Sequence, residues 1–118
     1  MSIIEGVVVG AETGGFYTTE IEQSLRFNDD DSAYLSWTPA SAGNRKTWTF
    51  STWVKRGNLG SYQVLFGAGS STSNRLCIRL DIDKLYVFEV AGGSTVDNVG
   101  TNAVFRDPSS WYHVTVHS

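Results

Sequence analysis

The chain has 118 residues, a mass of 12.9 kDa and a formal net charge of −3. A chain of this length forms one domain at most and can bury roughly two-thirds of the surface that its unfolded form exposes. Its 41% hydrophobic and 13% aromatic residues supply apolar surface for a folded core. The negative net charge gives no broad positive field, which argues against nucleic acid or an anionic membrane surface as the main partner.

The single cysteine, Cys77, excludes an intrachain disulfide and a multi-cysteine metal site. No run approaches the ~20 apolar residues of a membrane span. Glu5 and Gly6 interrupt the apolar N-terminus before it reaches the ~7 to 15 residues that a signal peptide needs. We therefore expect no membrane insertion, and synthesis in a cytoplasm.

Gly and Ser residues interrupt the chain at short intervals, and the runs between them are rich in Val, Ile, Thr, Tyr, Phe and Trp at period two. This pattern is typical of antiparallel strands, and no stretch has apolar residues at helical spacing with a cap and a stop. We predict an all-β chain. We expect residues 1–22, which are glycine-rich and do not alternate, to form an N-terminal arm, and residues 23–118 to form the domain.

Two short strands are expected at the start of the domain, over residues 23–27 and 33–37, because each has apolar residues at alternate positions. The segment between them predicts a hairpin turn. Asn28, Asp29 and Asp31 in this turn also offer the oxygen ligands that Ca²⁺ prefers. Asp and Asn are equally favoured in turns for backbone reasons, so the turn is the preferred interpretation and Ca²⁺ the one cofactor considered.

The longest alternating run, residues 47–56, predicts the strongest strand, with one face from Trp48 to Val54 and Trp53 among polar residues on the other. Flanking cations resemble the charges that protect an edge strand; they are Arg45, Lys46, Lys55 and Arg56.

Further strands are expected over 62–69, 75–80, 85–90, 102–107 and 111–118. The run 85–90 is apolar on both faces, which is typical of a central strand, and a tight hairpin turn at 81–84 precedes it. The alternation predicts core faces made by Tyr62, Val64 and Phe66, by Leu76, Ile78 and Leu80, and by Tyr112, Val114 and Val116; Cys77 and Arg79 are expected to point outward.

Five segments, taken in chain order, carry a family resemblance: SLRFNDDDSAYLSWTP, AGNRKTWTFSTWVKR, VLFGAG, KLYVFEV and VFRDPSSWYHVTV. They resemble concanavalin A-like (laminin-G-like) lectin domains, in particular those of bacteriophage structural proteins such as the tail fibres of marine phages. The resemblance covers about residues 23–117. It implies an antiparallel two-sheet β-sandwich, a jelly roll, with carbohydrate-binding or adhesive roles.

In the family that the chain resembles, further strands follow the one that here reads Trp-Tyr-His-Val. The sandwich is therefore expected to be truncated at its C-terminus, unless the native chain continues beyond Ser118. An open sheet edge invites pairing with another chain, so this departure favours assembly with a partner.

Two pairs of titratable residues have compositions that catalytic or metal sites use. Asp81 and Asp83 have the composition of a glycosidase carboxylate pair, but the Glu-x-Asp-x-x-Glu motif of the wider superfamily is absent and the turn interpretation is preferred. His113 and His117 share one face of a strand, where ~13 Å separates them, too far for one zinc ion. We expect no catalytic residues and no enzymatic activity.

Exposed aromatic residues are the remaining candidates for a binding site. Trp53, Trp37 and Tyr34 are candidates for stacking on a sugar or for an interface with a partner. Packing within the core or an interface is an open alternative for each of them.

The first hypothesis is a non-catalytic phage virion protein, made in the host cytoplasm and displayed on the particle as part of a tail fibre or as a capsid decoration. Its partners would be other virion proteins, further copies of itself in a homo-oligomer, and a cell-surface glycan. The alternatives are a free-standing carbohydrate-binding module and, third, a fragment of a glycanase.

Overall fold

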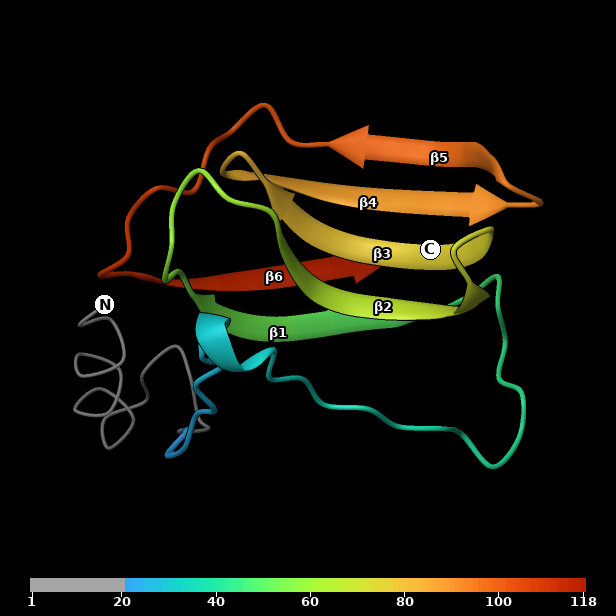
Figure 1. Cartoon of the computed structure of the whole chain (residues 1–118), viewed down its shortest axis with the longest axis horizontal. Helices are drawn as coiled ribbons and strands as arrows, with labels where there is room; N and C mark the ends of the chain where they lie inside the picture. The colour runs from blue at the N-terminus through green and yellow to red at the C-terminus, as the bar shows by residue number, and fades with distance from the viewer. Residues whose placement is uncertain (1–20) are drawn as a thin grey trace, which may run out of the picture. The chain divides into compact units, whose positions relative to one another are not determined.

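The computed structural model describes residues 21–118. Within those residues no helix is long and apolar enough to cross a membrane. The predicted all-β class with two antiparallel sheets is confirmed. In chain order (Figure 1) the elements are the 3-10 turn η1 (Asp29–Asp31) and the strands β1 (Thr49–Lys55), β2 (Gln63–Ser71), β3 (Asn74–Asp81), β4 (Lys84–Ala91), β5 (Ser94–Gly100) and β6 (Trp111–His117).

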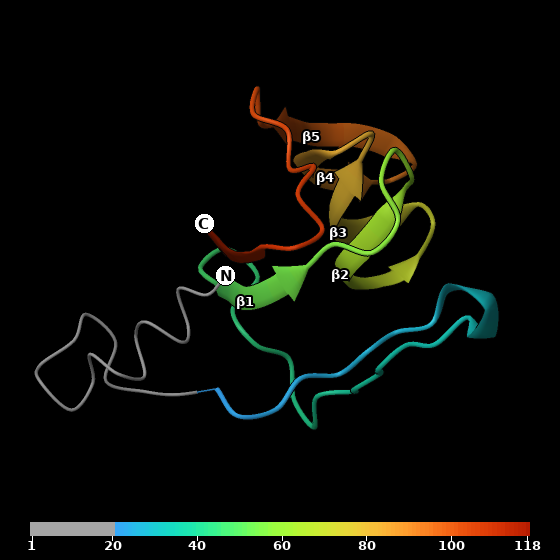
Figure 2. The ribbon, with the colours of Figure 1, turned by 90° about the vertical axis from the view of Figure 1, so that its left-hand side faces the viewer.

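Strands β2 to β5 form an antiparallel sheet in which each strand pairs with its neighbours in the sequence. Figure 2 shows this order, with β2 at one edge and β5 at the other. Two of its turns have positive φ at both residues: Ile82 and Asp83 (44° and 67°), and Gly92 and Gly93 (59° and 82°). Such turns match the right-handed twist of the strands that they join. The predicted hairpin turn at 81–84 is confirmed, and β4 is a central strand as predicted.

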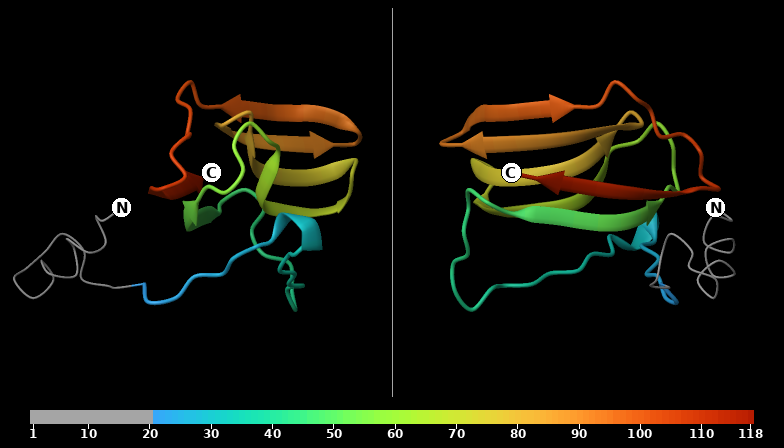
Figure 3. Two further views of the ribbon diagram at one scale, coloured as in Figure 1. Left: turned by 60° about the vertical axis from the view of Figure 1, so that its left-hand side comes forward. Right: turned by 180° about the vertical axis from the view of Figure 1, so that it is seen from behind.

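Strands β1 and β6 form a second, two-stranded sheet, and the right panel of Figure 3 shows them next to each other. Beyond the end of β6, the backbone amide of Ser118 donates to the carbonyl oxygen of Trp48 at 3.1 Å. Val114 on β6 is buried, and its alternate neighbours Tyr112 and Val116 are half-buried. The core face predicted for this strand is confirmed.

The chain divides into two compact units. One unit ends at Trp53 and resumes over His113–Ser118, and the other covers Val54–Tyr112 and contains the four-stranded sheet. Strands β1 and β6 each pass from one unit into the other.

The best-buried side chains of the four-stranded sheet lie on β3. Ile78 is fully buried and Leu80 is 3% exposed, both on the face predicted to point inward. Cys77 on the opposite face was expected to point outward, but it is also buried, and it lies opposite Phe88 of β4 in the register. Side chains therefore cover both faces of this strand. Burying one aliphatic side chain of this size stabilises a fold by about 1.5–3 kcal/mol.

The core face predicted for β2 is wrong. Val64 pairs with Arg79 and Phe66 with Ile78, so the register shifts between them. An irregularity of this kind places an extra residue in one strand and turns Val64 and Phe66 to opposite faces of the sheet. Together with Tyr62 they stay 39–53% exposed.

The strands predicted at 23–27 and 33–37 are also wrong: among the described residues, the first strand begins at Thr49. Alternating apolar residues form a stable strand only where a neighbouring strand pairs with their backbone, and neither sheet of the described chain includes these two segments. Only the turn between them forms, as η1. Their exposed apolar side chains include Leu25, Phe27, Leu35 and Trp37.

Near the end of the four-stranded sheet the strand assignment differs once more. The strand is β5, Ser94–Gly100, and residues 102–107 form a connection instead. The sequence does not predict β5 because few of its residues are apolar. In the structure all seven of them are exposed. The backbone of this connection is not part of a strand. The amide of Phe105 donates instead to the carbonyl oxygen of Asp83 in the β3–β4 turn, at 2.8 Å.

Most of the predicted arm, residues 1–20, lies outside the described residues. Ile21 and Glu22, the last two residues of that segment, are exposed and have no regular secondary structure.

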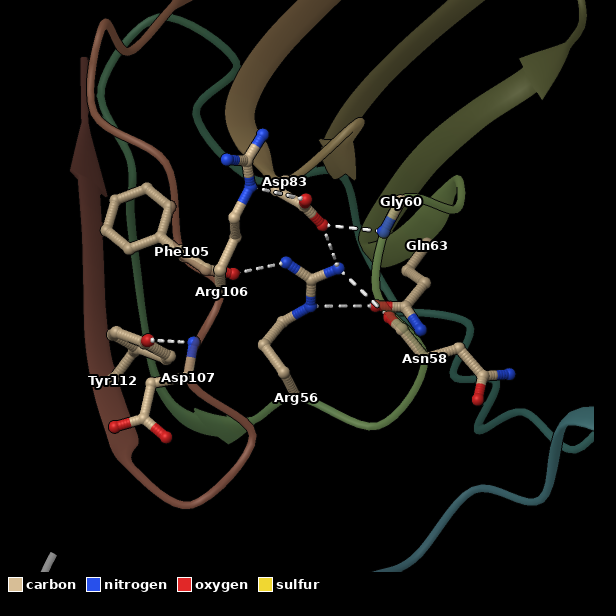
Figure 4. Close-up of polar contacts among 9 residues, drawn as sticks. All are labelled: Arg56, Asn58, Gly60, Gln63, Asp83, Phe105, Arg106, Asp107 and Tyr112. Atoms are coloured by element: carbon tan, nitrogen blue, oxygen red, sulfur yellow. Dashed lines mark hydrogen bonds and ion pairs between the residues drawn. The ribbon is translucent and has the colours of Figure 1, made fainter.

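A buried arginine ties the turn between β3 and β4 to two other connections (Figure 4). Arg56 follows β1 and is 4% exposed, and its Nη2 lies 3.1 Å from Oδ1 of Asp83. The guanidinium also donates to Oε1 of Gln63 and to the carbonyl oxygens of Asn58 and Phe105, at 2.7 to 3.1 Å. All three of its nitrogens therefore have partners, which is what makes burial of a charge tolerable.

Asp83 is buried to the same extent as Arg56. Its carboxylate accepts hydrogen bonds from the amide of Gly60 at 2.7 Å and from Nε of Arg106 at 3.0 Å. One hairpin turn thus fixes the loop at 56–60 and the segment at 105–106.

We expect Arg56→Met to lower the free energy of unfolding by about 3 kcal/mol or more, because it removes one of the two arginines that pair with the buried carboxylate of Asp83 and the donor to Gln63, Asn58 and Phe105. Lys55→Met, at the adjacent exposed position, is the control and should change stability little. Urea unfolding of both variants measures the difference. Equal losses in the two variants would show that the buried pair does not hold the turn.

Candidate functional site

An arginine surrounded by aromatic rings marks one face of the four-stranded sheet. The guanidinium carbon of Arg79 lies 4.8 Å from the ring centre of Phe88, 4.9 Å from that of Tyr62 and 5.9 Å from that of Tyr86. Its Nη1 donates to the Tyr62 hydroxyl at 3.3 Å, and its Nη2 pairs with Asp81 at 3.2 Å. The face of an aromatic ring attracts a cation that lies above it, and this attraction stabilises contacts of this kind. We call these four residues, Tyr62, Arg79, Tyr86 and Phe88, the aromatic–arginine face.

The ring of Tyr86 lies directly over Gly100 of the neighbouring strand. The two residues are opposite each other in the register of β4 and β5, and a Cβ atom at Gly100 would collide with the ring. A glycine is therefore required at this point for the ring to lie against the edge strand.

At the end of this face the surface is hollowed into an open depression of about 360 Å³. That volume is near the lower end of the range of small-ligand sites. We call it the Tyr86 depression; its lining residues are Asp81, Ile82, Lys84, Tyr86, Val104 and Arg106.

Charged side chains of both signs converge in the Tyr86 depression. Asp81 and Lys84 lie opposite each other in the register of β3 and β4. The carboxylate of Asp81 is held by Arg79. Arg106 enters from the connection before β6, with its Nε fixed by Asp83 at 3.0 Å while its side chain stays 63% exposed. Hydrogen bonds from the Gly60 amide, Arg106 and Arg56 lower the pKa of Asp83, so it stays ionised and keeps its hold on Arg106.

A second carboxylate steadies the connection that carries Arg106. Asp107 accepts hydrogen bonds from the hydroxyl groups of Ser109 and Ser110 and from the amide of Ser109, which lower its pKa to about 2. The amide of Asp107 donates to the hydroxyl of Tyr112 at 3.0 Å (Figure 4), and the Tyr112 ring meets Phe105 edge to face at 5.3 Å. The backbone on both sides of Arg106 is thus anchored.

The arrangement is suited to binding a polar ring-shaped ligand. An aromatic ring offers an apolar face for the C–H groups of a sugar, and the neighbouring carboxylate, ammonium and guanidinium groups accept and donate hydrogen bonds to hydroxyl groups. Concave sites with an apolar lining and a few convergent polar groups are the usual form of small-ligand sites.

The structure places Trp53 on β1, half-buried, with its ring stacked on that of His113 at 4.8 Å and 18°. Nε2 of His113 lies 2.9 Å from Oγ of Ser51. Within the described residues, no hydrogen bond from the ring of His113 to a carboxylate orients it. A serine and a histidine alone lack the orienting third group of a hydrolase triad.

Trp37 and Tyr34 are 84% and 79% exposed and lie outside the strands. Asn28, Asp29 and Asp31 lie at η1, where the Asn28 side-chain amide donates to Asp31 at 2.8 Å. No group of three acidic, histidine or cysteine side chains suited to a metal ion occurs in residues 21–118. Calcium binding at this turn stays a prediction, as do the binding roles of Trp37, Tyr34 and Trp53.

Reasoning from the sequence missed the Tyr86 depression and misjudged Arg56, which is a buried anchor and not an edge-protecting cation. A signal for Arg56 exists, because continuing the alternation of Trp48 to Val54 by one step reaches Arg56 on the inward face. The sequence contains no comparable signal for Arg106. Its place depends on a bond to a turn 23 positions earlier.

Comparison with known proteins identifies one family. The family described as the concanavalin A-like lectin/glucanases superfamily matches residues 29–118, which is most of the chain. Two antiparallel sheets agree with that assignment. No curated protein matches the chain, and no solved structure matches it.

We expect Gly100→Ala to displace the Tyr86 ring and to destabilise the fold by about 1–3 kcal/mol, the usual cost of inserting a methyl group where there is no room. Gly67→Ala, in the same sheet but with no atom near the new methyl group, is the matched control. NMR shifts of the Tyr86 ring and thermal melting measure both effects. An unchanged ring environment in Gly100→Ala would show that the glycine does not set the ring position.

Proposed function

The chain belongs to the concanavalin A-like lectin/glucanase superfamily, and from this premise we propose that it binds carbohydrate without cleaving it, at the Tyr86 depression. One observation carries the proposal: Tyr86, fixed over Gly100, shares an open depression with Asp81, Lys84 and Arg106. The depression therefore brings together the apolar ring and the polar groups that saccharide binding requires.

The partners of the two nearest carboxylates, Asp83 and Asp81, support binding over cleavage. A glycosidase needs one carboxylic acid with a raised pKa to protonate the leaving group. The pKa of Asp83 is lowered instead, and its buried carboxylate is occupied by Gly60, Arg56 and Arg106. Asp81 is the carboxylate that lines the depression, and it is paired with Arg79.

We expect Tyr86→Ala to weaken glycan binding about tenfold, since the loss of one aromatic contact costs about 0.5–1.5 kcal/mol beyond its buried area. Phe27→Ala removes a ring from an exposed position outside the depression and should leave affinity unchanged. A glycan array identifies ligands, and calorimetry compares the variants. Equal affinity of Tyr86→Ala and the unaltered chain would remove the site from the proposal.

We also propose, as a second function, assembly into a phage virion as a tail-fibre or decoration protein. What supports it is the resemblance of the sequence to phage structural proteins and the exposure of Leu25, Leu35 and Trp37, at 68–84%. Monomeric proteins rarely leave so many large apolar side chains near one another in sequence in contact with water. Further copies of the chain are natural partners in a symmetric particle.

Sedimentation tests this second function. We expect a homo-oligomer that Trp37→Ser dissociates, because an apolar anchor is lost from the contact. Ile82→Asn, which removes another exposed apolar side chain outside residues 25–37, should not dissociate it. A monomer at all concentrations would argue against assembly through residues 25–37.

A further inference from the structure

The guanidinium of Arg106 is anchored at its Nε by Asp83, and its side chain is 63% exposed. Nε donates to Oδ2 of Asp83, and among the described residues the two Nη atoms make no hydrogen bond. Figure 4 shows them on the side of the guanidinium away from Asp83. Because the carboxylate of Asp83 is buried and held by Gly60 and Arg56, it forms a rigid support for Arg106.

A fixed, exposed guanidinium fork is the group that best matches a planar carboxylate. Two parallel N–H groups bind both carboxylate oxygens, and such charge-assisted pairs are about twice as strong as neutral hydrogen bonds. Pre-organisation by Asp83 lowers the side-chain entropy that binding would otherwise cost.

The surroundings of Arg106 add to its positive charge. Lys84 lines the same depression, and no ion pair of Lys84 occurs within the described residues. The carboxylates nearby are already engaged, Asp81 with Arg79 and Asp83 with two arginines. Cations therefore outnumber carboxylates here, although the whole chain carries a net charge of −3. A local field of the opposite sign to the net charge selects an anion.

We propose that the ligand of the Tyr86 depression is a uronic acid-containing saccharide, whose carboxylate binds the Arg106 fork and whose ring lies on Tyr86. This inference rests on the proposed carbohydrate-binding function and names the ligand class of the same site. Lys84 contributes a second, longer-range attraction to the carboxylate. A neutral sugar would leave the fork without an anion.

The test compares uronate oligosaccharides with their methyl esters, which keep the sugar backbone and remove the charge. The full chain is titrated by calorimetry with oligogalacturonides, oligoalginates and glucuronate-containing oligomers, each in both forms, together with neutral oligosaccharides. We expect at least one acid form to bind about tenfold or more tighter than its ester, the value of one charge-assisted hydrogen bond. Raising the salt concentration should weaken the acid form only.

Variants separate the fork from general charge. Arg106→Gln should lose about tenfold or more in affinity for the acid and leave the affinity for the ester unchanged. Arg45→Gln, the same charge change at an exposed arginine outside the depression, is the control and should have no effect. Because Arg106 also pairs with Asp83, melting is measured for each variant. Lys84→Gln, which breaks no ion pair of the described chain, supplies an independent loss for the acid alone.

The outcomes distinguish the two levels of the proposal. Equal affinity for acids and esters, or binding of neutral sugars only, overturns the uronate inference and leaves carbohydrate binding in place. If a folded chain binds none of the saccharides, carbohydrate binding at this site is overturned as well. Equal losses in Arg106→Gln and Arg45→Gln would show an effect of net charge and overturn the role of the fork.

Discussion

The buried ion pair of Arg56 and Asp83 is the interaction on which the rest of the Val54–Tyr112 unit depends. A charge inside a protein must be paired and fully hydrogen-bonded, and here the partners come from the loop after β1, the β3–β4 turn and the connection before β6. The pair therefore fixes segments that are far apart in the sequence and that belong to no common strand ladder. It also sets the position of Arg106, because the same carboxylate holds both arginines.

The two faces of the four-stranded sheet serve different purposes. Ile78 and Leu80 point to a face of β3 that is apolar and buried at these two positions, as expected of a core. On the other face the apolar rings surround Arg79, whose side chain is only 16% exposed. A cation packed among rings keeps that face ordered without making it fully hydrophobic, and the Tyr86 depression lies at its end. The site is therefore kept in place by the core on the opposite face of the sheet and by the rings packed around Arg79.

The sequence predicts the strands that alternate strongly, β1, β3 and β6, the continuously apolar strand β4, and the tight turn between β3 and β4. It predicts less well where the structure depends on pairing between segments. Residues 23–27 and 33–37 alternate but lack a partner strand, whereas β5 has little alternation and forms because β4 pairs with it. The candidate site was out of reach for a related reason. Tyr86 appears in the sequence as one residue of a buried strand, and only the register with Gly100 and the bond from Arg106 to Asp83 show that it borders an open depression.

The meander order of β2, β3, β4 and β5 has a consequence for folding kinetics. Every pairing in this sheet joins strands adjacent in the chain through short connections, so its contacts close small loops and carry a low entropic cost. The bond from Arg56 to the carbonyl oxygen of Phe105, by contrast, spans 49 positions. We expect the hairpins to form first and the buried arginine to find its acceptors afterwards, so that a chain still emerging during synthesis holds an ordered sheet before it holds a finished binding site.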